Sequence, residues 1–235
     1  MQQQTTINQT ISFDGLSMHS GKMTQVLLEE APENHGITIN DVLVAPYNVT
    51  NTDGMTTVGN VSLTEHLLSA LFALKIDNLK ITVNTNEIPI MDGANKSFID
   101  TILVKKCIKE LISNKQYFFP QKKFLIKEND SLLSYEPWDD PTRKDLHFDC
   151  YVDFPYVGKQ QFSWKSNDFK SYYYHISPSK TFFWREQFQK ECKKDRCKGI
   201  IEKKNCIVFS DNNNLNNNEL AKHKLLDFIG DLKIF

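Results

Sequence analysis

The sequence lacks the cysteine patterns of disulfide-stapled scaffolds and of zinc ribbons. Its 235 residues include five cysteines, an odd number, and no two of them form a Cys-x-x-Cys pair. A disulfide framework normally has an even, regularly spaced set, and a zinc ribbon needs paired cysteines. We therefore expect free, reduced thiols and a reducing compartment.

Long apolar runs and targeting signals are also missing. No stretch approaches the roughly 18 consecutive apolar residues of a membrane-spanning helix. Residues 1–14 are polar, without a basic region followed by an apolar run, and they contain no arginine. These features disfavour a secretory signal and an organellar transit peptide. We expect a cytoplasmic protein with no transmembrane segment, or an organellar one if the source is eukaryotic.

Neither sign of charge dominates. The 28 lysines and arginines nearly balance the 29 acidic residues, which gives a formal net charge of -1. Such a chain has no long-range field that attracts nucleic acid or an anionic membrane, so we expect no nucleic-acid partner, and local cations must meet any anionic ligand. With 40% hydrophobic residues the chain can build one large core or two smaller ones. We expect a folded, soluble monomer.

Strand-like and helix-like segments alternate along the first half of the chain. Short β-prone runs between residues 5 and 44 predict antiparallel strands, and the apolar spacing of SLTEHLLSALFALKI predicts a helix that begins near Ser62. A strand at NLKITVN and a helix over Ser97–Ser113 follow. Residues 114–123, which include Pro120, form the predicted linker.

The second half has a similar order of elements. The runs KKFLIKE, HFDCYVDF, QQFSWKS and YYYHI predict strands, followed by a polar helix around Trp184–Lys194, a strand at NCIVFS and a helix from about Glu219 to Ile229. The tract DNNNLNNN, Asp211 to Asn218, is typical of an exposed loop. The similar order is compatible with an internal duplication, although the residues show no clear repeat.

Two interpretations compete for Thr64-Glu65-His66 in the first predicted helix. Consecutive helical residues project about 100° apart, so Glu65 would not share a metal's first shell with His66 but would reach a water molecule beside it. The alternative is a capping box, Ser62-Leu63-Thr64-Glu65, in which Glu65 only bonds the helix N-terminus. These residues alone favour the capping box.

The last predicted helix carries His223 and Asp227 four residues apart, with Asp231 one turn further on the same face. Taken alone, this spacing favours a surface hydrogen bond over a metal site. Together with His66, however, the pair supplies three zinc ligands and leaves an open position, which is the layout of a catalytic zinc. The remaining histidines have no spaced partner, and we interpret them as core or surface residues: His19, His35, His147 and His175.

Four blocks of the sequence resemble, in order, the bacterial UDP-3-O-acyl-N-acetylglucosamine deacetylase (LpxC) family. They are GLSMHSG, TEHLLSALFALKIDNLKITVNTNEIPIMDG, SKTFFW and KHKLLDFIGDL. The resemblance covers essentially the whole chain. It implies an α+β fold of two β-α-α-β domains, residues 1–115 and 121–235. In each domain a sheet carries two helices, the helices form a middle layer, and the zinc lies between the domains.

The resemblance also implies roles for individual residues. The zinc ligands would be His66, His223 and Asp227, and Glu65 would be the general base toward water. Thr181 would donate to the oxyanion, and Asp231 would complete the catalytic residues. The substrate would be contacted by Phe182 at the sugar or acyl chain, Lys224 at a phosphate, and Asp153 with Phe154 at the uridine.

The implied reaction is zinc-dependent hydrolysis of the N-acetyl group of a UDP-3-O-(3-hydroxyacyl)-N-acetylglucosamine, the committed step of lipid A biosynthesis. The partner would be this small nucleotide-sugar lipid. In the family, an aspartate matching Asp231 orients a histidine that follows the IGDL motif, and this histidine has no counterpart before Phe235. We therefore expect a C-terminally truncated relative.

Losing a positioned acid costs typically about 10²–10⁴-fold in rate but leaves the metal ligands in place. The alternative to an active deacetylase is a catalytically impaired homologue that binds zinc and UDP-sugar without efficient turnover. A purely structural metal site is a third, less favoured hypothesis. Further departures are Lys180 in place of the usual arginine, and Ile200 and Ile201 where glycine and a small residue are expected.

Overall fold

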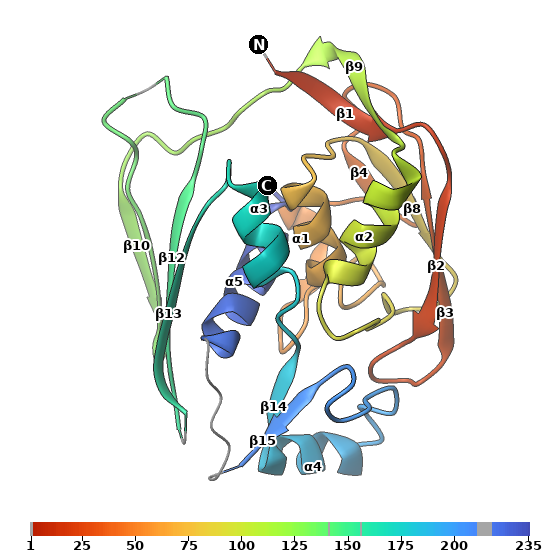
Figure 1. Ribbon diagram of the computed structural model, residues 1–235, viewed down its shortest axis with the longest axis vertical. Helices are drawn as coiled ribbons and strands as arrows, with labels where there is room; N and C mark the ends of the chain where they lie inside the picture. The colour runs from red at the N-terminus through yellow and green to blue at the C-terminus, as the bar shows by residue number, and fades with distance from the viewer. Residues whose placement is uncertain (1, 141, 156, 211–217) are drawn as a thin grey trace.

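The computed structural model describes residues 2–140, 142–155, 157–210 and 218–235, so the predicted loop at 211–217 lies outside the described residues. The fold is α+β, as the sequence predicts. In Figure 1 the helices occupy the middle of the molecule, with the strands of the first half on one side and a long hairpin of the second half on the other. The middle helices are α1 (Glu65–Ala73), α2 (Lys96–Lys105) and α5 (Glu219–Leu232).

The first half is organised around a five-stranded sheet with the order β2-β3-β8-β4-β5. Its strands are β2 (Ile11–Leu16), β3 (Met23–Glu29), β4 (Ile37–Ile39), β5 (Val42–Leu43) and β8 (Leu79–Val83). All pairs are antiparallel except β4 with β8. Two smaller strand pairs lie outside this sheet: β1 (Gln3–Ile7) with β9 (Ile108–Asn114), and β6 (Val49–Asn51) with β7 (Thr57–Val58). A short 3₁₀ helix, η1 (Pro46–Asn48), precedes β6.

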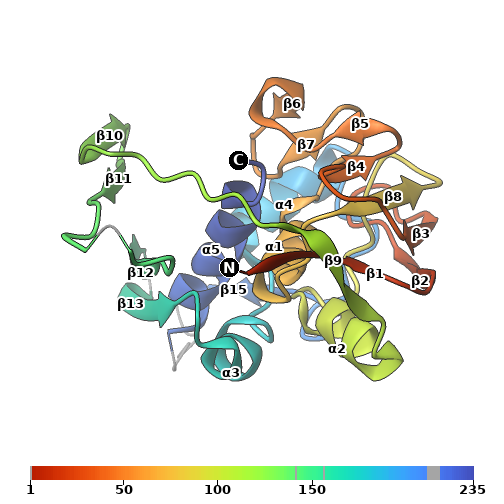
Figure 2. The ribbon, with the colours of Figure 1, turned by 90° about the horizontal axis from the view of Figure 1, so that it is seen from above.

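The second half carries its strands as three separate pairs. These are β10 (Phe124–Glu128) with β11 (Ser131–Tyr135), β12 (His147–Phe154) with β13 (Gly158–Lys165), and the parallel pair β14 (Phe182–Trp184) with β15 (Ile207–Phe209). Helix α4 (Arg185–Lys193) follows β14 directly. The β10–β11 hairpin stands away from the helices (Figure 2), and every residue of β10 is exposed.

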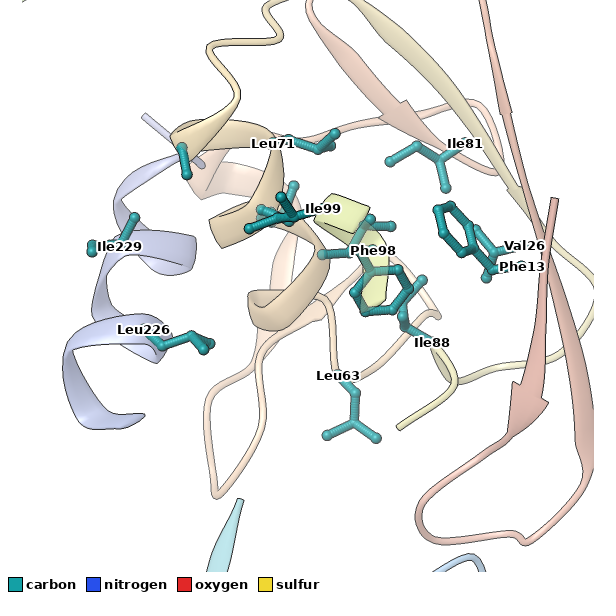
Figure 3. Packing of buried hydrophobic residues seen from close by; sticks show 14 of the residues in the cluster. Phe13, Val26, Leu63, Leu71, Ile81, Ile88, Phe98, Ile99, Leu226 and Ile229 are labelled. Carbon is teal, nitrogen blue, oxygen red and sulfur yellow. The ribbon is translucent and has the colours of Figure 1, made fainter. Parts of the chain in front are cut away.

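Helix α1 is buried on all sides. Eight of its nine residues are buried, and only Phe72 is half-buried. Figure 3 shows the reason, since α1 lies between apolar side chains of the sheet, such as Ile81, and Leu226 and Ile229 of α5. A helix with apolar residues around its whole circumference is stable only inside a protein. The polar side chains of α1 must therefore find partners in the interior.

The prediction of one helix over Ser97–Ser113 is wrong in its second part. Helix α2 ends at Lys105, and Lys106 adopts a left-handed conformation with φ of 49° that terminates it. The following residues form β9, which pairs with β1. Glycine usually occupies such a C-terminal position, so a lysine there leaves no sequence signal for the end of the helix.

The predicted strand YYYHI is also wrong, because Tyr172–Ile176 forms a π-helix, η2, after the short helix α3 (Phe169–Ser171). Tyr172 and Ile176 are both fully buried, whereas Tyr174 is exposed. Burial therefore follows a helical spacing rather than the alternation of a strand. The high strand propensity of tyrosine caused the wrong prediction, and tertiary packing, which includes contacts with α5, overrides it.

The other predicted elements of the second half agree with the structure. Helices α4 and α5 and strand β12 lie where the periodicity predicts them. All five cysteines are free, as expected. Within the described ranges, none of the helices has the length and apolar character that crossing a bilayer requires.

One glycine sets the distance between α1 and α5. A Cβ atom placed on Gly230 of α5 would lie 2.0 Å from the carbonyl oxygen of Glu65, the first residue of α1. A methyl group does not fit at that distance. The two helices can approach this closely only because residue 230 has no side chain.

We predict that Gly230→Ala destabilises the protein by about 3 kcal/mol, because the added methyl group forces α1 and α5 apart. The melting temperature should fall by about 6–12 °C in a chain of this size. The control is Gly54→Ala. Gly54 has φ of 72°, a backbone conformation that is unfavourable for alanine, but an added methyl group would meet no atom within 4 Å. Its cost should be about 1 kcal/mol from backbone strain alone. Equal melting temperatures for the two variants would contradict the close helix contact.

Candidate metal centre

Glu65 and His66 reach the interior because α1 begins at Glu65. Leu63 has φ of 61°, which separates Ser62 from the helix, and Thr64 becomes the N-terminal cap. The carboxylate of Glu65 accepts a hydrogen bond of 3.0 Å from the backbone N–H of Thr56. The capping-box interpretation is therefore wrong, since Glu65 is the first helical residue and its carboxylate bonds a different loop.

Helix α5 directs His223 and Asp227 toward α1. His223 is 3% exposed and the side chain of Asp227 is 20% exposed, so the pair lies in the interior rather than on the surface. The interpretation of this pair as a surface hydrogen bond is therefore wrong as well. Apolar residues of α5, including Leu226 and Ile229, pack in the core and fix the rotation of the helix.

The two helices bring three candidate ligands together. The Nε2 atom of His66 lies 3.4 Å from Oδ1 of Asp227, and Nε2 of His223 lies 3.5 Å from the same oxygen. The two imidazole rings are nearly perpendicular, with centroids 5.2 Å apart. One potential ligand atom from each of the three side chains lies within 4.8 Å of the other two. Among the described residues, no other set of three histidine, cysteine or acidic side chains meets this condition.

This geometry fits a tetrahedral zinc. Zn–N and Zn–O bonds of about 2.0 Å place neighbouring ligand atoms roughly 3.3 Å apart. The Oδ1 atom of Asp227 is buried and accepts no hydrogen bond from the described part of the chain. A buried carboxylate oxygen without a donor is costly, and a cation between the two rings would satisfy it.

The orientation of His223 is fixed by the backbone. Its Nδ1–H donates a hydrogen bond of 3.0 Å to the carbonyl oxygen of Ser179. This bond assigns the proton to Nδ1 and leaves the lone pair of Nε2 directed toward Asp227. Metal-binding histidines are held in this way by a carbonyl or carboxylate behind the ring.

The electrostatics of the centre favour an anionic aspartate and a neutral His223. Burial lowers the pKa of His223 to about 4. Burial opposes ionisation of Asp227, but the neighbouring His223 and Lys224 hold the pKa of its carboxyl group below the usual range. Burial raises the pKa of Glu65 to about 7. Burial also opposes protonation of His66, but the adjacent Asp227 raises its pKa.

Three of the predicted substrate residues lie beside the centre. The ring of Phe182 is 5.6 Å from that of His223 and 5.5 Å from that of Phe154. The Nζ atom of Lys224 lies 5.5 Å from the Phe182 ring and donates a hydrogen bond of 2.9 Å to Oδ2 of Asp227. The side chain of Lys224 is 46% exposed, so a cation borders the centre on its solvent side.

Asp153 lies apart from this group. The residues of β12 alternate between an inner face, on which Phe154 is half-buried, and an exposed face, which includes Asp153. Successive strand residues project to opposite sides, so the sequence motif does not place the two side chains together. The carboxylate of Asp153 therefore faces solvent on the outer side of the hairpin.

Thr181 and Asp231 both have partners within the protein. Both the backbone N–H and the hydroxyl of Thr181 donate to the carbonyl oxygen of Gly93, at 2.6 and 3.0 Å. Asp231 accepts a hydrogen bond of 2.6 Å from the hydroxyl of Thr56. Burial raises the pKa of Asp231, and this hydrogen bond opposes the effect.

Sequence reasoning missed Thr56, which touches both helices of the centre. It donates to Glu65 through its N–H and to Asp231 through its hydroxyl, although Asp231 is 175 residues away in sequence. Ser179, which orients His223, was missed for the same reason. Each lies in a loop without periodicity, and a single threonine or serine carries no motif.

The other histidines stay outside the group of three ligands. His19 is buried, with Nδ1 3.8 Å from Sγ of Cys197. His35 contacts the carbonyl oxygen of the next residue, and His147 and His175 are exposed. These positions agree with their interpretation as core or surface residues.

Comparison with known proteins identifies the family. The family model described as LpxC, UDP-3-O-acyl N-acetylglycosamine deacetylase, matches residues 4–235. The UDP-3-O-acyl-N-acetylglucosamine deacetylase of Campylobacter hominis is 33% identical over 250 residues, which cover 98% of this chain and 82% of that protein. The enzymes of the same name from Sulfurimonas denitrificans and Helicobacter pylori are each 32% identical with the same coverage. The chain therefore belongs to the LpxC family of UDP-3-O-acyl-N-acetylglucosamine deacetylases.

Proposed function

We propose that this chain is a zinc-dependent deacetylase that hydrolyses the N-acetyl group of a UDP-3-O-(3-hydroxyacyl)-N-acetylglucosamine, in lipid A biosynthesis. The observation that carries the proposal is the set of His66, His223 and Asp227, with two separations of 3.4 and 3.5 Å and an aspartate oxygen for which the described residues supply no donor. The names of the relatives support the reaction and its substrate.

In the proposed reaction, zinc would act as a Lewis acid and Glu65 would transfer the proton. When bound, zinc supplies Lewis acidity, which makes water nucleophilic near neutral pH and polarises an amide carbonyl. Glu65 lies next to His66 on α1 and is buried, so it can act as a base shielded from bulk solvent. It takes a proton from the attacking water and returns it to the leaving nitrogen, which yields acetate and a free amine.

The remaining residues orient the substrate and stabilise charge. Thr181 exchanges its hydroxyl bond to Gly93 for one to the developing oxyanion. Lys224 binds a phosphate of the UDP group, because it is an exposed cation at the border of the centre. Phe182 and Phe154 form an apolar surface beside His223 that suits the acyl chain or the sugar.

We also propose that residues 1–115 and 121–235 are two domains with the zinc between them, and that the protein acts as a cytoplasmic monomer. The division is supported by the origin of the ligands, because His66 comes from the first half and His223 and Asp227 from the second. In this arrangement, bound zinc links the two halves. Metal binding and stability are therefore coupled.

Replacing Asp227 should abolish tight zinc binding. We predict that the wild-type protein binds one zinc ion and that Asp227→Ala lowers the affinity by roughly 100-fold or more, since even outer-sphere changes cost about 10–100-fold. Competition with a chromophoric chelator measures both affinities. Asp231→Ala, one turn further along α5, is the control and should retain zinc. Unchanged affinity in Asp227→Ala would rule out the proposed ligand set.

Glu65→Gln should separate metal binding from turnover. Glutamine keeps the size of the side chain and an oxygen that accepts the Thr56 N–H bond, but it is a very weak base. We predict unchanged zinc content and a rate of acetate release lower by about 10²–10⁴-fold. If the wild-type protein binds zinc and UDP but releases acetate no faster than Glu65→Gln, the chain is the catalytically impaired homologue instead.

Lys224→Met should weaken nucleotide binding. A charge-assisted hydrogen bond contributes about 1.5–3 kcal/mol, so the affinity for UDP should fall roughly tenfold or more. Isothermal titration with UDP measures this change. Lys222→Met is the matched control, because Lys222 lies on the same helix with its Nζ atom 5.3 Å from the Phe162 ring. An equal loss in both variants would show a nonspecific charge effect and contradict the role of Lys224.

A further inference from the structure

A buried polar cluster lies directly behind the metal centre. It consists of Ser69 on α1, Asn95 at the N-terminal cap of α2, and Tyr172 in the π-helix η2, all of them 0% exposed. The hydroxyl of Tyr172 is 2.6 Å from Oγ of Ser69, and the amide Nδ2 of Asn95 donates to the Tyr172 oxygen at 2.6 Å. The cluster therefore joins both helices of the first half to a helix of the second half.

The direction of these bonds follows from their chemistry. Burial raises the pKa of Tyr172 well above its ordinary value, so its hydroxyl keeps its proton. The Tyr172 oxygen accepts a hydrogen bond from Asn95. We assign the Tyr172 hydroxyl as the donor to Ser69, because among the described residues the Ser69 oxygen is the acceptor within its reach. A phenylalanine at position 172 would fill the same space and leave Ser69 and Asn95 without these bonds.

Asn95 links the cluster to a zinc ligand. It occupies the cap position of α2, yet its side chain makes no capping bond to that helix. Besides its bond to Tyr172, Nδ2 donates to the backbone carbonyl of His66 at 3.3 Å, and Oδ1 is buried with no hydrogen-bond partner among the described residues. The side chain of an asparagine at a helix N-cap normally accepts a hydrogen bond from its own helix. Here the amide group of Asn95 instead bonds the backbone of α1.

The segment that carries Tyr172 also holds the second histidine. Seven residues after Tyr172, the carbonyl of Ser179 accepts the Nδ1–H of His223. Between them, the carbonyl of Ser177 accepts the backbone N–H of Asn95 at 3.2 Å. The segment 172–179 of the second half therefore has contacts at both of its ends. Tyr172 contacts α1, the helix that carries His66, and Ser179 contacts the ring of His223.

We propose that the Tyr172 hydroxyl is a positioning group of the metal centre, which fixes α1 relative to residues 172–179 so that His66 meets His223 and Asp227 at ligand spacing. This inference rests on the proposed zinc site. Tyr172 touches neither the metal ligands' donor atoms nor the substrate in this role. It acts through Ser69 on the same helix as His66 and through Asn95 on the carbonyl of His66.

The test compares Tyr172→Phe with Tyr173→Phe. Tyr173 is the matched control, because its hydroxyl also joins η2 to α2, through a 2.7 Å bond to Asp100, but makes no hydrogen bond to α1 within the described part of the chain. Zinc affinity is measured by chelator competition at a temperature where circular dichroism shows each variant to be folded, and the melting temperature of the metal-free protein is recorded. We expect zinc affinity to fall about 10-fold in Tyr172→Phe and to stay within about twofold of wild type in Tyr173→Phe.

The outcomes separate this inference from the proposed function. If Tyr172→Phe melts at a lower temperature but binds zinc as tightly as the wild type, Tyr172 is only structural and the inference fails. If the wild type itself binds no zinc, the proposed function fails and the inference with it. Should Tyr172→Phe not fold, Ser69→Ala removes the other partner of the Ser69–Tyr172 hydrogen bond and provides the same test. Alanine is favourable in a helix, so this variant should keep α1 helical. Wild-type zinc affinity in that variant would overturn the inference.

Discussion

The structure depends on the burial of nearly all of one short helix. Helix α1 has nine residues, and its polar side chains Glu65, His66 and Ser69 lie in the interior with its leucines. A buried polar group without a partner costs about 1–3 kcal/mol. Glu65 accepts a hydrogen bond from Thr56, which lies just before the helix, and Ser69 is hydrogen-bonded to Tyr172, 103 residues away. His66 lies 3.4 Å from Asp227 of α5. Burial of α1 thus creates the candidate centre.

The approach of α5 completes the arrangement. Because Gly230 has no side chain, α5 approaches the carbonyl of Glu65 closely enough to carry His223 and Asp227 to His66. The protein alone leaves one requirement unmet, since Oδ1 of Asp227 has two imidazole nitrogens near it but no hydrogen-bond donor among the described residues. Packing of apolar residues sets the spacing of the ligands, and a cation would stabilise the negative charge between them.

The sequence predicts those features that follow from local periodicity. Helix α5 and strand β12 have clear patterns, and the i,i+4 spacing of His223 and Asp227 correctly places them on one face. Periodicity fails where a single backbone conformation decides, as at Lys106, which ends α2, and at Leu63, which removes the capping box. The π-helix at Tyr172 reflects tertiary packing, including contacts with α5, which strand propensity does not capture. Thr56 and Asn95 acquire their roles only through contacts across the fold.

We propose that His66, His223 and Asp227 hold one zinc ion between α1 and α5. Anomalous diffraction at the zinc edge, from crystals of the zinc-loaded protein, tests this directly. We expect one strong peak at about 2.0–2.2 Å from Nε2 of both histidines and from the Asp227 carboxylate. A peak elsewhere, for example at the thiols of Cys197 and Cys206, or no ordered peak between the two helices, would contradict it.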